Sequence, residues 1–318
     1  MTESLHISNS EIQTFKRCRR KWWFGYYRRL KPLHERKVGP LRIGNRVHES
    51  LESYYLALAG VDTADAVKVA LAKHDMLVMV DLETADESDE KTIKEITSQG
   101  DLSRAMLEGY FEWLAETGAD QGYRVVGIEQ TVSTEITTPL GAQFHTKAKL
   151  DLVVEDEDAG ERWFLDHKTV GDFTTPTRML HLDEQMLMYN WLQSLTVPGK
   201  TEGAIYNMIK KSKRTQRAKP PFFMRFKVRH SQQELDSFYV RLLGELDQIA
   251  RVRQLLDEGQ DPRRVAYPSP KSECSWDCQY LYICPLIDRT QDDAEHAISL
   301  TFREGDPYEY YGEEKKSG

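Results

Sequence analysis

The sequence from Phe144 to Val170, FHTKAKLDLVVEDEDAGERWFLDHKTV, contains two runs rich in Val, Leu and Phe on either side of an acidic turn. The runs Phe144–Val154 and Arg162–Val170 have the length and partial alternation of β-strands. Because the connection between them is short, we expect the two strands to be antiparallel neighbours in one sheet.

Three of the charged side chains in these runs indicate a site. Asp166 and Lys168 are two positions apart on the second strand, so both leave the same face, and Asp151 lies on the first strand. Facing residues of antiparallel strands lie about 4.5–5.5 Å apart, so the two aspartates can share one divalent cation such as Mg²⁺ or Mn²⁺. A lysine beside them can position an attacking water and stabilise negative charge. Alternating charge on a solvent-facing strand would also explain the pattern.

Helical patterns surround these strands. Ser8 and Glu11 form a capping-box pattern that predicts a helix to Tyr27. Further helices are expected over 41–58, 62–80, 90–117, 178–196 and 231–258, and strands over 123–136, 203–210 and 221–229. This order predicts an α/β fold, a mixed central β-sheet flanked by helices. We expect an N-terminal helical region over 1–120, a core sheet and helix over 121–230, a C-terminal helix and cysteine region over 231–290, and an acidic tail over 291–318.

The charge of the chain is unevenly distributed. The net charge is -8, yet residues 16–37 carry ten Lys or Arg against one acid, and residues 210–229 carry nine and no acid. Such segregation is typical of a nucleic-acid footprint, although two solvated faces would explain it as well. The candidate DNA contacts are Arg19, Arg20, Lys210, Lys211, Lys213 and Arg214. The aromatic residues among the first group either stack on bases or, as is more common, belong to the core.

Two further motifs complete an ordered series along the chain. Gly44 and His48 form G-x-x-x-H in an expected helix before the strands, and Gln185 and Tyr189 form Q-x-x-x-Y in the expected helix after them. The order G-x-x-x-H, D, D-x-K, Q-x-x-x-Y resembles the motif series of RecB-like PD-(D/E)xK nucleases. The resemblance spans most of the chain and implies a restriction-endonuclease-like core.

The resemblance also implies a role for each matching residue. His48, Asp151, Asp166 and the backbone carbonyl of His167 would bind Mg²⁺ or Mn²⁺, and Lys168 would be the catalytic lysine. Gln185 and Tyr189 would steady the lysine region or contact DNA. Glu129 stands where many of these nucleases carry an extra acid, or is an ordinary strand glutamate.

The four cysteines form one early position and a late cluster: Cys18, Cys274, Cys278 and Cys284. Four thiolates can bind zinc or an iron–sulfur cluster, and disulfides are disfavoured in a protein expected to be cytoplasmic. The spacing resembles the CRISPR-associated protein four family and the AddB-type helicase–nuclease subunits. It implies a 4Fe–4S cluster with all four cysteines as ligands, joining the two ends of the chain.

These patterns together predict a divalent-metal-dependent deoxyribonuclease, an exonuclease acting on single-stranded DNA or DNA ends. The alternative is a catalytically silent DNA-binding scaffold with an iron–sulfur or zinc staple. No stretch has the ~18–20 apolar residues of a membrane helix, and no G-x-x-x-x-G-K-[ST] motif occurs, so neither a membrane nor ATP is expected as a partner. Protein partners would be further copies of the chain or proteins of recombination or CRISPR systems.

Overall fold

The computed structural model describes residues 4–34, 36–86, 88–196 and 201–311. The chain forms two compact units, and each is discontinuous in sequence, unlike the contiguous segments expected above. Unit 1 comprises residues 1–35, 131–148 and 233–318, and unit 2 comprises residues 36–130 and 149–232. Within the described part of the chain, no helix is both long and apolar enough to span a membrane.

The sheet of unit 2 is mixed, as predicted. Its strands are the second half of β4 (Gln143–Asp156), β5 (Glu161–Val170), β6 (Thr201–Lys210) and β7 (Phe223–Arg229). β5 pairs antiparallel with β4 and parallel with β6, and β6 pairs antiparallel with β7. β3 (Tyr123–Thr137) pairs with the other edge of β4. β5 therefore lies inside the sheet, which explains its long apolar run.

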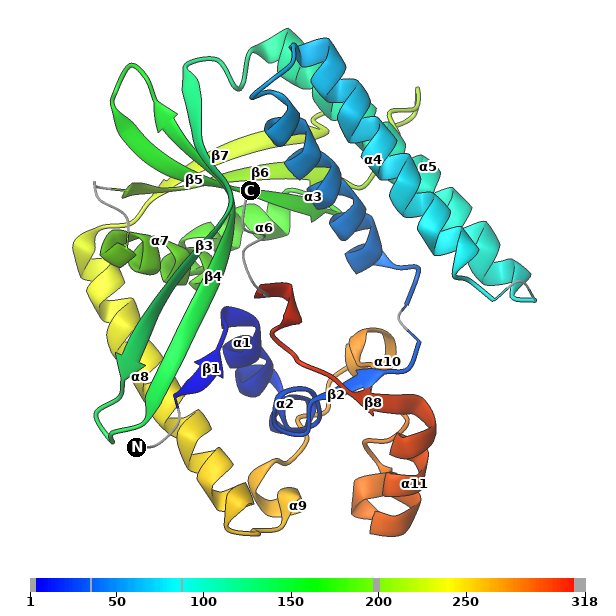
Figure 1. Ribbon diagram of the computed structural model, residues 1–318, viewed down its shortest axis with the longest axis vertical. Helices are drawn as coiled ribbons and strands as arrows, with labels where there is room; N and C mark the ends of the chain where they lie inside the picture. The colour runs from blue at the N-terminus through cyan, green and yellow to red at the C-terminus, as the bar shows by residue number, and fades with distance from the viewer. Residues whose placement is uncertain (1–3, 35, 87, 197–200, 312–318) are drawn as a thin grey trace. The chain divides into compact units, whose positions relative to one another are not determined.

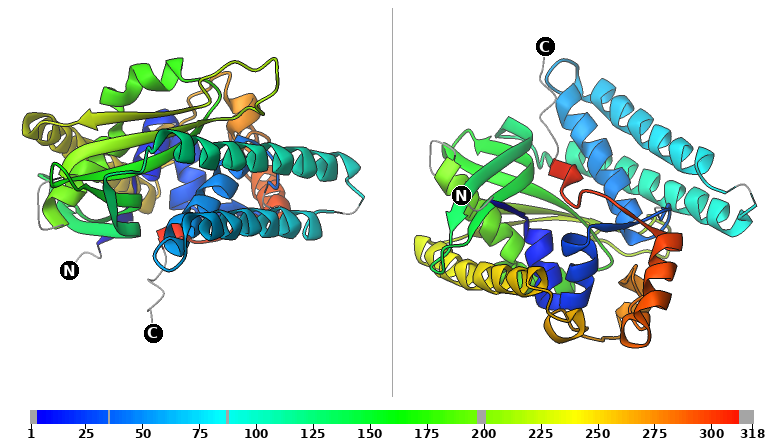
Figure 2. Two further views of the ribbon diagram at one scale, coloured as in Figure 1. Left: turned by 90° about the horizontal axis from the view of Figure 1, so that it is seen from above. Right: turned by 60° about the horizontal axis from the view of Figure 1, so that its bottom comes forward.

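Helices cover both faces of this sheet. Side chains alternate along a strand, and Trp163 and Leu165 belong to a core shared with α3 (Pro40–Ala57), α4 (Thr63–Glu83) and α5 (Glu90–Thr117). Figures 1 and 2 show these three helices side by side. Phe164 points the other way and contacts Tyr189 of α7 (Glu184–Thr196), with ring centroids 6.2 Å apart.

The helix expected over 178–196 is wrong at its start. The chain forms α6 (Thr174–Met179), then the 3₁₀ turn η2 (Leu180–Leu182), and α7 follows after a break. At the break Asp183 has extended backbone (φ -72°, ψ 101°), and its carboxylate accepts the backbone N–H of Gln185 at 3.0 Å. Asp183 therefore caps a new helix, a preference that aspartate shares with asparagine and serine.

Unit 1 contains short elements from both ends of the chain and one long helix. Its elements are β1 (Leu5–Ile7), α1 (Asn9–Arg17), α2 (Arg19–Trp22), the π-helix η1 (Trp23–Tyr27), β2 (Leu30–Pro32), α8 (Gln232–Asp257), α9 (Pro262–Val265), α10 (Cys274–Asp277), η3 (Leu286–Asp288), α11 (Gln291–Thr301), β8 (Phe302–Glu304) and η4 (Glu309–Tyr311). Ser8 caps α1 as predicted, accepting the Glu11 N–H at 3.2 Å. The expected single helix to Tyr27 is interrupted at Cys18, which has extended backbone.

The N-terminal and C-terminal segments of unit 1 are joined by hydrogen bonds and ion pairs. Glu11 is fully buried and accepts hydrogen bonds from Trp22 Nε1 at 2.8 Å, from Arg253 at 2.9 Å and from the Tyr308 hydroxyl. β2 pairs antiparallel with β8. Of the expected acidic tail, residues 291–311 form α11, β8 and η4, and the remainder lies outside the described residues.

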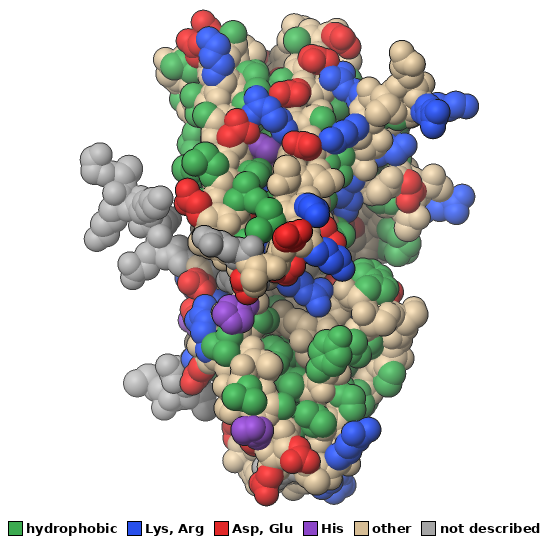
Figure 3. Space-filling model, turned by 90° about the vertical axis from the view of Figure 1, so that its right-hand side faces the viewer, with side chains coloured by type: hydrophobic (Ala, Val, Ile, Leu, Met, Phe, Trp, Pro, Cys, Tyr) green, Lys and Arg blue, Asp and Glu red, His purple; other side chains and the backbone are tan. Residues whose placement is uncertain are grey.

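The basic segment 16–37 is largely matched by acids of unit 1. Six of its cations form ion pairs with acids between residues 245 and 309: Lys16, Arg17, Arg20, Lys21, Arg28 and Lys31. Trp22, Trp23 and Phe24 are buried, so these aromatic rings belong to the core. On the face shown in Figure 3 the basic and acidic side chains are interspersed. Much of the charge segregation in the sequence thus reflects pairing within the fold.

Arg20 gives the strongest test of this pairing. Its side chain is 1% exposed and makes two hydrogen bonds to Asp288, at 2.7 and 2.9 Å. We expect Asp288→Ala to lower the free energy of unfolding by about 1–3 kcal/mol, less than for a fully buried pair because Asp288 is half exposed. The measurement is urea denaturation.

The control is Lys94→Ala, which removes an exposed pair with Glu90 on α5 and should cost under about 1 kcal/mol. Equal losses in the two variants would contradict a special role for the buried arginine.

Candidate active site

Strand β5 presents Asp166 and Lys168 on the same face as Phe164, because side chains alternate along a strand. Lys168 Nζ lies 2.9 Å from Asp166 Oδ2. Asp166 is buried, at 4% exposure, whereas 30% of the lysine side chain is exposed. The expected D-x-K pair is therefore a close ion pair rather than two charges facing solvent.

Strand β4 brings Asp151 to the same place. Leu152 pairs with Leu165, which confirms that the two strands are antiparallel neighbours. This register places Asp151 and Asp166, the next residue on each strand, opposite each other. Asp151 Oδ2 accepts the backbone N–H of His167 at 2.9 Å. This hydrogen bond fixes the Asp151 carboxylate beside the backbone of β5.

Helix α3 supplies His48. Its Nδ1 lies 3.3 Å from Asp151 Oδ2, and its ring meets the ring of His167 edge to face. Gly44 lies one helical turn earlier, where an added Cβ would be 3.3 Å from the Thr169 hydroxyl oxygen. The glycine therefore allows α3 to approach β5 closely, which gives the G-x-x-x-H spacing a physical basis.

Helix α7 supplies the partners of the lysine. Lys168 Nζ donates to Gln185 Oε1 at 2.8 Å, and Gln185 Nε2 donates to the Tyr189 hydroxyl at 3.0 Å. The four-residue spacing places Gln185 and Tyr189 on one face of the helix. The structure thus joins Lys168, Gln185 and Tyr189 in one hydrogen-bonded chain.

The electrostatics of the site are dominated by burial. Burial raises the pKa of Asp166 to about 6; Lys168 opposes this change and the charge of Asp151 adds to it. Burial also acts to raise the pKa of Asp151, but the hydrogen bond and charge of His48 outweigh it and hold that pKa below its usual value. Burial lowers the pKa of His167 to about 3, so its ring is neutral. For His48, burial acts to lower the pKa, and the contact with Asp151 outweighs it, leaving the pKa raised.

The donor set fits a divalent cation. Asp166 Oδ2 is buried with no well-formed hydrogen bond, despite its closeness to the lysine ammonium. Two carboxylates and an imidazole are ligands that hard or borderline cations accept. Among the residues that the structure describes, no three His, Cys, Asp or Glu side chains form a ready-made metal-binding group. In the structure His48 contacts Asp151, and Lys168 contacts Asp166.

Glu129 lies near these residues but has its own partner. It forms an ion pair with Lys149, and its backbone adopts a left-handed conformation (φ 50°) within β3. Burial raises the pKa of Glu129; Lys149 opposes the change and the charges of Asp151 and Glu52 add to it. The structure therefore places Glu129 within electrostatic reach of Asp151, paired with a cation.

Sequence reasoning missed the residues that hold His167. The His167 ring points to the opposite face of β5 and stacks on Tyr55. Its Nδ1 lies 2.7 Å from Asn207 Nδ2, and Asn207 Oδ1 accepts from Arg225 Nε at 3.0 Å. Arg225 also pairs with Asp120 at 2.6 Å. No motif marks these residues, because their roles depend on the parallel pairing of β5 with β6.

The residues predicted to contact DNA lie in different environments. The structure corrects the assignment of Arg20, which is buried against Asp288 and has no free surface. Arg19 lies over the ring of Phe15. Lys210, Lys211, Lys213 and Arg214 lie at the end of β6 and in the loop after it, where Arg214 pairs with Glu112 at 2.6 Å. The basic residues of β7 are also paired: Arg225, Lys227 and Arg229 each contact an acid.

All four cysteines belong to unit 1, and all four are partly buried free thiols. Burial raises the pKa of the Cys278 thiol, and the charges of Cys274 and Cys18 add to this effect. Backbone N–H groups point at two of the sulfurs: that of Ser269 lies 3.4 Å from Cys18 Sγ, and that of Lys271 lies 3.5 Å from Cys274 Sγ. In the described part of the chain the cysteines do not form a closed metal-binding group.

A buried carboxylate beside a second, partly buried one, with a lysine next to them, is the kind of site at which a divalent ion promotes hydrolysis of a phosphodiester bond. Residues 6–285 match the PD-(D/E)XK nuclease superfamily. The chain belongs to this superfamily, whose members are nucleases that typically use divalent metal ions and act on nucleic acids. None of the curated proteins compared matches the chain.

The hydrogen bond from Asn207 to His167 can be tested by truncation. We expect Asn207→Ala to lower the free energy of unfolding by about 1–3 kcal/mol, because His167 Nδ1 would be left buried without a donor. The exposed Asn45, also in unit 2, provides the control, and Asn45→Ala should change stability by less than about 0.5 kcal/mol. Equal stability of both variants in urea denaturation would contradict the role given to Asn207.

Proposed function

We propose that the chain is a divalent-metal-dependent deoxyribonuclease, acting as an exonuclease on single-stranded DNA or DNA ends. The observation that carries this proposal is the placement of Lys168. Its ammonium group lies between the Asp166 carboxylate and the Gln185 amide, at 2.9 and 2.8 Å, beside the second carboxylate of Asp151. A purely structural surface lysine would not need a buried carboxylate and an oriented amide.

His48, Asp151, Asp166 and the His167 carbonyl would hold Mg²⁺ or Mn²⁺. When bound, such an ion lowers the pKa of a coordinated water and polarises the phosphoryl oxygens. Lys168 remains charged, because the pull of Asp166 outweighs the effect of burial on its pKa. Its role is to orient the attacking water and to stabilise the charge that develops on the phosphate. Gln185, itself held by Tyr189, keeps the ammonium in place.

The different roles of Asp166 and Lys168 give a catalytic test. Asp166→Ala removes a proposed metal ligand, so cleavage should be abolished and binding of Mn²⁺ weakened. Lys168→Ala retains the ligands, so Mn²⁺ should still bind while the rate falls by roughly 10²–10³. The measurements are single-turnover cleavage of end-labelled single-stranded DNA and titration with Mn²⁺.

The matched controls are Asp65→Ala and Lys68→Ala, an exposed pair on α4, and both should cleave at the wild-type rate. A Lys168→Ala variant as fast as the wild type would contradict the role given to Lys168. A wild type that binds DNA without cutting it would favour a silent DNA-binding scaffold instead.

For the DNA contacts we propose the loop that follows β6. Lys213 and Arg214 are exposed there, and Lys210 and Lys211 are partly exposed at its start. Neighbouring acids reduce the local charge, since Arg214 pairs with Glu112 and Lys213 Nζ lies 3.8 Å from Asp101. A phosphate backbone could displace such exposed pairs at little cost. Assembly with further copies or with recombination or CRISPR proteins stays a prediction.

We also propose that Cys18, Cys274, Cys278 and Cys284 hold a 4Fe–4S cluster, with zinc as the alternative occupant. Two features support a metal here. The charges of Cys18 and Cys274 both act to raise the pKa of Cys278, and those of Cys18 and Cys278 act to raise the pKa of Cys284. Backbone N–H groups directed at sulfur, as at Cys18 and Cys274, stabilise thiolates in iron–sulfur sites.

Metal analysis tests this second proposal. Protein purified without oxygen should contain about four irons per chain and absorb in the visible range, as a cluster with four thiolate ligands requires. Cys278→Ala should lose the iron, whereas Ser275→Ala, one residue from Cys274, should retain it. Stoichiometric zinc without iron would assign the site to zinc, and the absence of both metals would refute a metal site at the cysteines.

A further inference from the structure

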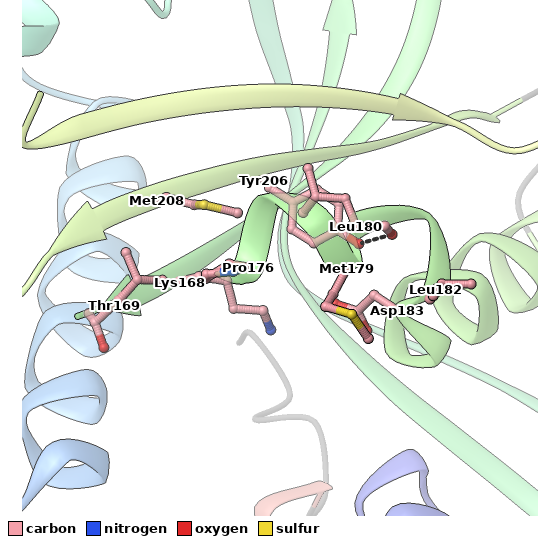
Figure 4. Close-up of a pocket in the computed structure, with 10 residues that line it drawn as sticks. Lys168, Thr169, Pro176, Met179, Leu180, Leu182, Asp183, Tyr206 and Met208 are labelled. Atoms are coloured by element: carbon pink, nitrogen blue, oxygen red, sulfur yellow. Dashed lines mark hydrogen bonds between the residues drawn. The ribbon is translucent and has the colours of Figure 1, made fainter. Parts of the chain in front are cut away.

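A pocket of about 270 Å³ opens beside Lys168, on the face of β5 that carries the catalytic residues. Most of its lining is apolar: Pro176, Met179, Leu180, Leu182 and Met208 surround it, together with the stem of Lys168. Figure 4 shows the lysine and Met208 extending from the strands and Met179, Leu182 and Asp183 from the helical segment beyond. The pocket therefore adjoins the proposed reaction centre and differs from it in chemistry.

The rim of the pocket exposes apolar side chains. Met179, the last residue of α6, is 52% exposed, and Leu182, the last residue of η2, is 67% exposed. The few polar groups here have protein partners: the Tyr206 hydroxyl donates to the Leu180 carbonyl at 3.1 Å, and Asp183 caps α7. Apolar walls with a small number of fixed polar groups are typical of sites that bind a small organic ligand.

The position of Lys168 indicates what that ligand is. Its ammonium group belongs to the proposed reaction centre, while its side chain lines the pocket. In a nucleotide, one sugar separates the phosphate from the base. If the phosphate contacts the Lys168 ammonium, the base is therefore close enough to enter the pocket. The apolar lining and the carboxylate of Asp183 disfavour a second phosphate in the pocket. A nucleobase has apolar faces and a polar edge, which match the lining and its rim.

We propose that this pocket binds one unpaired nucleobase of the strand being cut, next to the scissile phosphate. The proposal rests on the proposed nuclease function and names the feature of the substrate that the site selects. A base in a duplex can enter the pocket only after it is unpaired and unstacked, so the pocket favours single strands over duplexes. Methionine suits such a role, because its flexible thioether adapts to bases of different shape.

The experiment combines abasic substrates with variants of the rim. Single-stranded DNA carries one abasic position, moved stepwise along the strand, and single-turnover cleavage is measured with Mn²⁺. For the wild type, one position near the cut should slow cleavage by roughly 5- to 150-fold, the effect of losing one base contact. In the double variant Met179→Ala, Leu182→Ala the intact strand should already be slow, and the abasic position should add little.

The control is the double variant Met79→Ala, Leu41→Ala, which truncates exposed side chains of the same types on α4 and α3. It should retain the full abasic effect. Both double variants remove side chains that are more than half exposed, so both should melt within a few degrees of the wild type. An abasic effect of equal size in the rim variant and the control would refute the pocket, as would its absence at every position in the wild type.

A binding measurement separates this proposal from the nuclease proposal. 2-Aminopurine placed at the sensitive position should change its fluorescence on binding in Ca²⁺, and the rim variant should lose that change. If the wild type cuts no DNA, the proposed function fails. The sensitive position is then located by scanning 2-aminopurine along the strand instead of by cleavage of abasic substrates. A fluorescence change at one position that depends on Met179 and Leu182 would still support the pocket, and the same response in the rim variant would refute it.

Discussion

The main constraint on unit 2 is electrostatic: two carboxylates lie side by side where little water reaches them. Asp151 and Asp166 lie on neighbouring strands, and burial together with their mutual repulsion makes their ionised forms costly. Three donors reduce that cost: the Lys168 ammonium, the His48 ring and the backbone N–H of His167. They do so incompletely, since Asp166 retains a raised pKa and an oxygen without a well-formed hydrogen bond. The divalent cation proposed for this site would add positive charge beside both carboxylates.

The position of β5 inside the sheet makes such an arrangement rigid. Its alternation sends Asp166 and Lys168 to the face of α7 and the ring of His167 to the face of α3. Each face then fixes the strand independently. Gln185 holds the lysine from one side, while Asn207, positioned by Arg225, holds the histidine ring from the other. The backbone between them, which carries the His167 carbonyl, is restrained from both directions, as a preorganised site requires.

Local pattern and motif order predicted much of this from sequence. The apolar runs around Asp151 and Asp166 predicted two antiparallel strands, and Ser8 predicted a helix start. Most of what the sequence did not predict depends on contacts between distant residues. Arg20 looked like part of a nucleic-acid footprint because its partner Asp288 is 268 residues away. Asn207 and Arg225 carry no local signal, since their role appears only when β6 lies beside β5. The break before α7 was missed because the cap at Asp183 lies within an otherwise helical pattern.

The cysteine region of unit 1 differs from a zinc finger in the contacts that hold it together. In small metal-dependent domains the metal supplies most of the folding free energy. Here the segments that carry Cys18 and Cys284 are already joined by the Arg20–Asp288 pair, and Arg20 also donates to the Cys284 carbonyl at 3.2 Å. β2 and β8 pair further along, and Tyr280 donates to the Leu30 carbonyl at 2.7 Å. A cluster would therefore bind to ends that the chain itself holds together, so its loss should affect the thiols and their loops before it affects the rest of the unit.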